Sequence, residues 1–201
     1  MEENTSELLK SIMESFEKID YIKSTDIPNI DLYMDQVTTF MDKRLRNHSR
    51  NPKEDKVMTK TMINNYAKND LLPPPVKKKY SREHVIVLLF IYYFKSFLSI
   101  NDIQTLLKPV TENFFDNNSD FSIQDIYDEV IQLEKSQIED IKADVIRQFT
   151  LADKTFEEAP LDSREFLKTF ALICAMSYDL YIKQSIIEKL IDGLRERFDN
   201  K

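Results

Sequence analysis

Apolar residues recur along most of the chain at the spacing of three and four residues that is typical of an α-helix. The first such segment is SELLKSIMESFEKI, residues 6–19. A helix of this kind is stable only when its apolar face packs against other helices. The pattern therefore predicts an all-α fold, with further helices over residues 32–46, 58–72, 81–98, 100–107, 123–149 and 163–198.

Helix boundaries are marked by residues that accept hydrogen bonds from free backbone N–H groups. Thr59 or Thr61 and Ser81 are expected N-caps, and Ser99 and Ser122 each stand three residues before an aspartate, as in a capping box. Pro109 is expected to end the helix over 100–107, because proline cannot continue the hydrogen-bond ladder.

The last predicted helix, 163–198, is apolar nearly all round between Phe166 and Ile182. We therefore expect this part to be buried in a core or an interface. Cys174, the single cysteine, lies there and is expected to be a small buried residue. A chain without internal disulfides, with a polar acidic start and an apolar run too short to span a bilayer, is expected to be cytoplasmic.

Composition argues against catalysis. Gly193 is the only glycine, so no glycine-rich phosphate-binding loop is present. The two histidines, His48 and His84, are far apart in the sequence, and no nucleophile stands with a base and an orienting group. We therefore expect no enzyme, no cofactor and no metal site.

Charge is distributed unevenly. The net charge is −7, yet residues 40–85 hold 12 Lys+Arg against 5 Asp+Glu, a difference of +7. Residues 111–201 hold 11 Lys+Arg against 20 Asp+Glu, a difference of −9. This asymmetry indicates a segment that binds a polyanion, attached to an acidic body.

The basic region has an ordered series of short motifs. It runs from a helix containing Tyr66 through LLPP at 71–74 and Tyr80-Ser81 to a long apolar helix at 85–97, then to SINDI at 99–103. In this order and spacing the region resembles the DNA-binding domain of the mercury-resistance-regulator (MerR) family. The resemblance implies a helix-turn-helix with a wing, here reduced to residues 76–80.

The whole sequence also resembles an uncharacterised group of Gram-positive bacterial proteins that is known only as a domain of unknown function. That second resemblance implies no established activity.

A DNA-binding interpretation assigns specific contacts. Asparagine can pair with adenine, while lysine and threonine reach guanine or phosphate from a recognition helix. The expected recognition-helix residues are Lys60, Thr61, Asn64, Asn65 and Lys68. The expected phosphate contacts are Lys77, Lys78, Lys79 and Arg82 at the wing, extended by Lys43, Arg44, Arg46, Arg50 and Lys53.

These observations predict three parts: an N-terminal amphipathic helix at 1–25, a MerR-like domain at 26–108 and an acidic helical domain at 109–201 for dimerisation or sensing. The expected function is a transcription regulator that binds duplex DNA, with a homodimer through the C-terminal helices. The alternative is a protein-interaction module with an inherited helix-turn-helix layout. Asn64, which stands where the MerR family usually has arginine, and the short wing favour this alternative.

Overall fold

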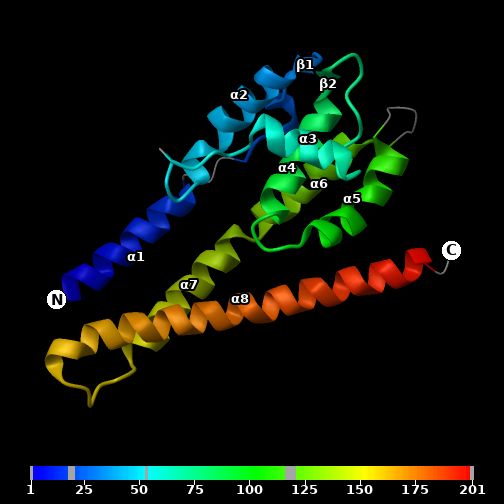
Figure 1. The fold of residues 1–201 in the computed structure, drawn as a ribbon. Coiled ribbons are helices and arrows are strands. Elements are labelled where there is room, and N and C mark those ends of the chain that lie inside the picture. The colour runs from blue at the N-terminus through cyan, green and yellow to red at the C-terminus, as the bar shows by residue number, and fades with distance from the viewer. Residues whose placement is uncertain (1, 18–20, 53, 116–120, 200–201) are drawn as a thin grey trace. The chain divides into compact units, whose positions relative to one another are not determined.

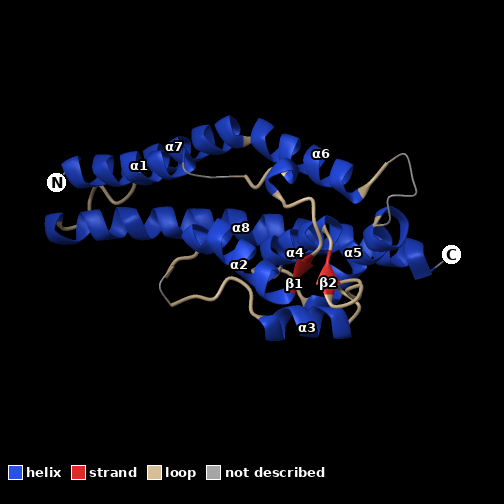
Figure 2. Ribbon diagram, turned by 90° about the horizontal axis from the view of Figure 1, so that it is seen from above, coloured by secondary structure: helices blue, strands red, loops and turns tan. Residues whose placement is uncertain are grey.

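The computed structural model describes residues 2–17, 21–52, 54–115 and 121–199, and most of them lie in helices (Figures 1 and 2). This confirms the all-α class. The elements in chain order are α1 (Glu2–Glu17), η1 (Ser24–Asp26), β1 (Leu32–Tyr33), α2 (Met34–Leu45), η2 (Arg46–His48), α3 (Lys60–Lys68), β2 (Lys79–Tyr80), α4 (Arg82–Phe94), α5 (Ile100–Phe114), α6 (Ile123–Ser136), α7 (Ile138–Asp153) and α8 (Leu161–Asp199).

The chain forms two compact units, and each unit combines two separate stretches. Unit 1 comprises Met1–Asp20 and Leu133–Lys189, and unit 2 comprises Tyr21–Gln132 and Leu190–Lys201. These stretches do not coincide with the three segments expected from the sequence. The expected boundary after residue 108 falls inside α5, and α6 as far as Gln132 belongs to the same unit as α2–α5.

The core of unit 2 surrounds α4, whose residues from 84 to 91 are all buried. The short antiparallel sheet lies beside it, with Leu32 opposite Tyr80 and Tyr33 opposite Lys79. From α6, the Tyr127 ring meets Phe90 edge to face at 5.6 Å. The Tyr127 hydroxyl donates to the Ile22 carbonyl at 2.7 Å, so the start of the unit and α6 close over the same core.

The expected caps form at three helix starts. Thr59 Oγ1 accepts the Met62 N–H at 3.2 Å, and Ser99 and Ser122 accept the N–H groups of Asp102 and Asp125. The caps are local side-chain to backbone bonds, which explains why the sequence alone located these starts.

Pro109 does not end its helix, contrary to expectation. Helix α5 continues through it to Phe114. Proline removes one backbone hydrogen bond, at a cost of about 3 kcal/mol in a helix interior. The apolar face begun by Ile103 and Leu107, both buried, continues past the proline with the partly buried Val110 and Phe114, so packing outweighs that loss.

The segment 123–149, expected as one helix, forms two. The break lies at Gln137, whose N–H bonds to the Glu134 carbonyl only three residues back. The boundary between the units lies close to this break, because Leu133 in the last turn of α6 is the first residue of the second stretch of unit 1. The apolar pattern is continuous, but the surface that it covers changes.

Unit 1 is held by α1, α7 and α8. Its buried core consists of Val145, Phe149, Ala152 and Leu172, and the partly buried side chains of Leu9, Ile12, Met13 and Phe16 on α1 pack against it. Helix α1 covers Glu2–Glu17 of the N-terminal segment expected at 1–25. Residues 18–20 lie outside the described ranges, and residues 21–23 are not helical.

The apolar part of α8 is not buried in a core, contrary to one of the two expectations. Between Phe166 and Ile182 only Leu172 is buried, and Cys174 is exposed rather than buried. The reason is the small number of helices around it: one side of α8 faces α1 and α7, and no other described helix of unit 1 covers the opposite side. No helix in the described ranges is long and apolar enough to cross a membrane.

Candidate nucleic-acid interface

Helix α3 is sharply two-sided. Ile63 and Tyr66 are buried, whereas five polar residues are exposed: Lys60, Thr61, Asn64, Asn65 and Lys68. At 100° per residue these five occupy an arc of about 140° on one side of the helix. The structure therefore brings the five predicted recognition-helix residues onto one solvent face that carries no carboxylate of its own.

Both ends of α3 are fixed to the rest of unit 2. At the start, the Lys60 ammonium forms an ion pair with Asp35 in the first turn of α2. At the end, Gln104 of α5 donates to the Asn69 carbonyl at 3.3 Å. Helix α3 thus contacts α2 at its start and α5 at its end.

The connection between α2 and α3 is long but anchored. Asn51 N–H donates to Asp55 Oδ2 at 3.2 Å, and a hydrogen bond from the Ser49 hydroxyl lowers the pKa of the Asp55 carboxyl. The Val57 carbonyl accepts a hydrogen bond from Lys95 Nζ at 2.8 Å. Burial lowers the pKa of this Lys95 ammonium. Lys53, an expected phosphate contact, lies outside the described residues.

The LLPPP segment leads the chain out of the core to a turn. The N–H groups of Leu71 and Leu72 both bond to the Tyr66 carbonyl, and the two leucine side chains are buried. Asp70 holds the left-handed conformation, with φ 54°, that ends the helix where no glycine is available. The prolines then keep the chain extended, because their ring fixes φ and prevents a helix.

A two-residue hairpin follows the prolines. Val76 and Lys79 exchange two backbone hydrogen bonds, of 3.1 and 2.9 Å, around Lys77 and Lys78. Both central residues have positive φ, at 48° and 63°. This is the conformation of a type I′ turn, which Asn-Gly adopts most easily and which costs about 1–2 kcal/mol for each residue with a longer side chain. The turn therefore holds two exposed lysines at an energetic cost.

His84 ties this turn to the start of α4. Its Nδ1 accepts the Ser81 N–H at 3.0 Å, in the place of the glutamate or glutamine of a capping box, and its Nε2 lies 3.4 Å from the Pro74 carbonyl. The imidazole is buried, and the rings of Tyr80 and Phe115 meet it edge to face. Burial lowers the pKa of His84, opposed by the Pro74 hydrogen bond and by the charges of Glu83 and Asp31.

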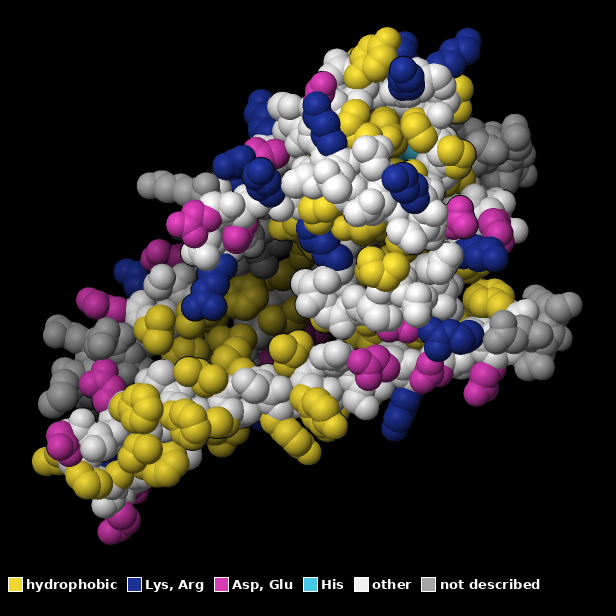
Figure 3. All heavy atoms as spheres, viewed as in Figure 1, with side chains coloured by type: hydrophobic (Ala, Val, Ile, Leu, Met, Phe, Trp, Pro, Cys, Tyr) yellow, Lys and Arg dark blue, Asp and Glu magenta, His cyan; other side chains and the backbone are white. Residues whose placement is uncertain are grey.

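Three predicted contact residues have their guanidinium groups engaged within the fold. Arg82 donates to Gln124 at 2.9 Å and to the Ile27 carbonyl at 3.2 Å. Arg46 bonds to Asp42 and to the Pro52 carbonyl, and Arg44 lies 3.8 Å from Asp26. Lys77 and Lys78 are exposed, whereas Lys79 is half-buried. In Figure 3, Lys and Arg side chains gather over the part of unit 2 that α2, α3 and β2 form.

Tyr33 joins this surface, although the sequence pattern placed it on a helix. It lies in β1, is 55% exposed, and its ring is 5.3 Å from the Lys79 ammonium. A search for helical periodicity misses it, because Tyr33 is placed here by its cross-strand pairing with Lys79 in a two-residue strand. The pair stiffens the base of the hairpin through a cation–π contact.

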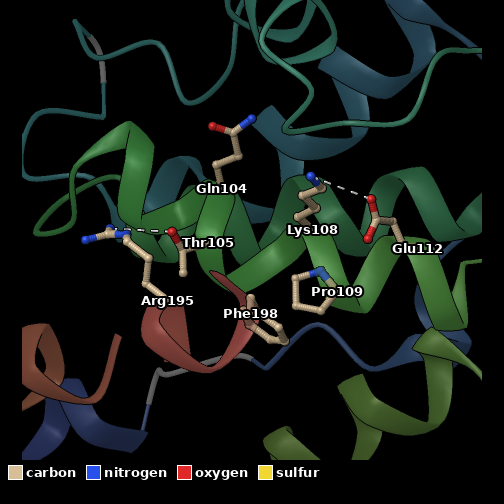
Figure 4. A pocket seen from close by; sticks show the side chains of 7 residues that line it. All are labelled: Gln104, Thr105, Lys108, Pro109, Glu112, Arg195 and Phe198. Atoms are coloured by element: carbon tan, nitrogen blue, oxygen red, sulfur yellow. Dashed lines mark hydrogen bonds and ion pairs between the residues drawn. The ribbon is translucent and has the colours of Figure 1, made fainter. Parts of the chain in front are cut away.

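A separate hollow of about 500 Å³ in unit 2 lies between α5 and the last turns of α8 (Figure 4). Arg195 there bonds to Asp102 at 3.0 Å, and Lys108 lies 3.9 Å from Glu112. The Ser99 hydroxyl and Arg195 lower the pKa of the Asp102 carboxyl. Each named charge therefore has an opposite charge at hand, and the contacts join the end of α8 to α5.

Residues 22–130 match the family described as Domain of unknown function (DUF1836). The chain belongs to the DUF1836 family. Comparison with curated proteins and with solved structures gave no match. The matched DUF1836 region is nearly identical to Tyr21–Gln132, the long stretch of unit 2, so the family domain contains α3, the hairpin and residues 123–130 of α6 together.

The strained turn predicts a gain in stability on substitution. Replacing Lys77 by Asn and Lys78 by Gly is expected to raise the free energy of unfolding by about 1–2 kcal/mol, because Asn-Gly adopts positive φ more easily. Urea denaturation measures it. The control Lys77→Gln with Lys78→Gln keeps the strain and is expected to stay within about 0.5 kcal/mol of the unmodified protein. An equal increase in the free energy of unfolding of the control would show that the loss of charge, and not the relief of strain, causes the effect.

The buried histidine predicts pH-dependent stability. Because the pKa of His84 is lowered from 6.5 in the folded chain, the unfolded chain binds more protons at pH values between the folded-state pKa and 6.5. The free energy of unfolding should therefore fall below about pH 6.5, by at most about 1.4 kcal/mol by pH 5.5, which is the limit for one proton. His84→Gln keeps an acceptor for the Ser81 N–H but does not titrate.

The His84→Gln variant should therefore lose less stability than the unmodified protein between pH 7.5 and 5.5, whatever its stability at pH 7.5. Urea denaturation at several pH values measures the difference. Parallel pH profiles for the two proteins would show that another group titrates.

Proposed function

We propose that this DUF1836 protein binds duplex DNA and acts as a transcription regulator. The observation that carries the proposal is the two-lysine hairpin. Lys77 and Lys78 occupy positions where Asn-Gly would cause less backbone strain. We infer that their charge at the tip of the hairpin serves a function that offsets this strain. Phosphate binding is such a function, since lysine is a strong phosphate ligand.

The exposed face of α3 supplies the second element. It presents two asparagines between lysines at either end, and asparagine pairs with adenine through two hydrogen bonds in the major groove. A two-sided helix that is capped by Thr59 and held by Lys60 and Gln104 has the fixed orientation that base contacts need.

The order of elements supports a winged helix-turn-helix of the MerR kind. In this interpretation α2 and α3 are the two helices of the motif, the 76–80 hairpin is the wing, and β1 supplies the strand that pairs with β2 at its base. The longer connection of residues 46–59 replaces the tight turn, and its anchors at Asp55 and Lys95 hold it against unit 2.

The local positive charge of the segment 40–85 favours DNA binding, although the whole chain is acidic. The segment 40–85 holds seven more basic than acidic residues, although the chain as a whole has a net charge of −7. Affinity for DNA then depends on a few residues, and it should be strongly weakened by salt.

Fluorescence anisotropy with random duplex DNA across a salt series tests the proposal. Lys77→Gln with Lys78→Gln should weaken binding and reduce the slope of log affinity against log salt by about 1.8, or 0.9 for each lost phosphate contact. The matched control is Lys154→Gln with Lys183→Gln, which removes the same charge from exposed lysines of unit 1.

The control should leave both affinity and slope nearly unchanged. Equal losses of affinity in the two variants would show that binding depends on net charge alone and not on the hairpin. A complete lack of binding by the unmodified protein at low salt would reject DNA binding and leave the alternative, a surface that binds an acidic protein.

A further inference from the structure

Helix α8 has one side without charge over several turns. Between Phe166 and Ile187 its charged residues are Lys168, Asp179 and Lys183. They stand four residues before, and seven and eleven residues after, the buried Leu172, so all three lie on the same side of the helix as Leu172. Lys183 is exposed on this side and pairs with Asp179 at 2.8 Å. Lys168 bonds there to Asp153 of α7 at 2.8 Å.

The opposite side carries large apolar residues that are exposed. They are Phe166 at 69%, Phe170 at 52%, Ile173 at 57%, Leu180 at 63% and Tyr181 at 65% exposure. Phe166, Phe170, Ile173, Ser177 and Leu180 follow one another at alternating steps of four and three residues, which is the spacing of a helix–helix seam. Figure 3 shows hydrophobic side chains gathered along this part of α8.

The area of this face is close to that of a stable protein interface. Phe and Tyr side chains bury about 150–250 Å² each when fully covered, so covering the five exposed residues removes about 600 Å² from water on each copy. The smaller residues between them add to this figure. A standard stable interface buries about 800 Å² on each partner, so one long helix face is nearly sufficient.

The pattern of large and small residues is complementary to itself. If two copies of α8 run antiparallel about a two-fold axis between residues 173 and 174, Phe170 faces the small Ser177 of the other copy. In the same register Ile173 faces Cys174, and Phe166 faces Tyr181. The large side chains of Phe170 and Ile173 then lie beside the small Ser177 and Cys174 of the other copy, and an aromatic pair closes each end, as close packing requires.

The antiparallel direction is also favoured by charge. Parallel copies would bring Asp162 and Glu165 at the start of one helix next to the same residues of the other, whereas antiparallel copies oppose the helix dipoles favourably. A two-fold axis gives a closed dimer in which each copy uses the same surface.

We propose that this DUF1836 protein forms a two-fold homodimer in which the Phe166–Tyr181 face of α8 packs antiparallel against the same face of a second copy. The partner is a second copy because the face complements itself in size and carries no charge that a different protein would have to match. This interface does not depend on whether the chain binds DNA.

Analytical ultracentrifugation of the full chain tests the dimer. The unmodified protein should sediment at twice its monomer mass of 23.8 kDa. Phe170→Glu, which places one carboxylate from each copy in the interface, should raise the dissociation constant at least about 100-fold. The matched control is Leu133→Glu, at a site in α6 that is 60% exposed, and it should leave the constant unchanged.

Cysteine cross-linking tests the direction in a Cys174→Ser background. Phe166→Cys protein mixed with Tyr181→Cys protein should form a cross-linked pair with a short bis-maleimide, whereas Phe166→Cys alone should not. Self-cross-linking of Phe166→Cys would overturn the antiparallel arrangement. A monomeric unmodified protein at about 50 µM, or a dimer that Phe170→Glu does not weaken, would overturn the interface.

Discussion

The position of the basic hairpin depends on one buried imidazole. His84 bonds to the Ser81 N–H with one ring nitrogen and lies within reach of the Pro74 carbonyl with the other, so a single side chain joins the proline segment to the first turn of α4. Tyr80 and Phe115 enclose the ring, and α4 behind it is buried along most of its length. Because α4 is the most buried helix of unit 2, its contacts through His84 fix the position of the hairpin relative to the core.

The hairpin also illustrates how stability and function compete. A short turn of two residues with positive φ is formed most cheaply by Asn-Gly, yet this chain uses Lys77 and Lys78 there and has only one glycine in total. Elsewhere the same scarcity of glycine is handled by Asp70, a residue that tolerates the left-handed conformation better. Asp70 merely ends a helix, whereas the two lysines place charge at a tip, which is why the turn points to a function.

Features that depend on neighbouring residues were predictable from the sequence. The caps at Thr59, Ser99 and Ser122 and the exposed face of α3 follow from local hydrogen bonding and periodicity. Features that depend on distant packing were not. Helix α5 continues through Pro109 because its apolar face is buried. The helix ends near Gln137, where the surface that it packs against changes. Arg82 donates a hydrogen bond to Gln124, which is 42 residues away in the sequence. The exposure of Cys174 depends on how many helices surround α8, which periodicity cannot reveal.

An NMR titration tests most directly whether α3 and the 76–80 hairpin form one surface for duplex DNA. Amide shifts of the ¹⁵N-labelled chain would be followed as random duplex DNA is added at low salt. If the two elements form that surface, the largest shifts should lie in residues 60–68 and 76–80, and the buried α4 should stay unaffected. Shifts that lie mainly elsewhere, or no shifts at all, would contradict it.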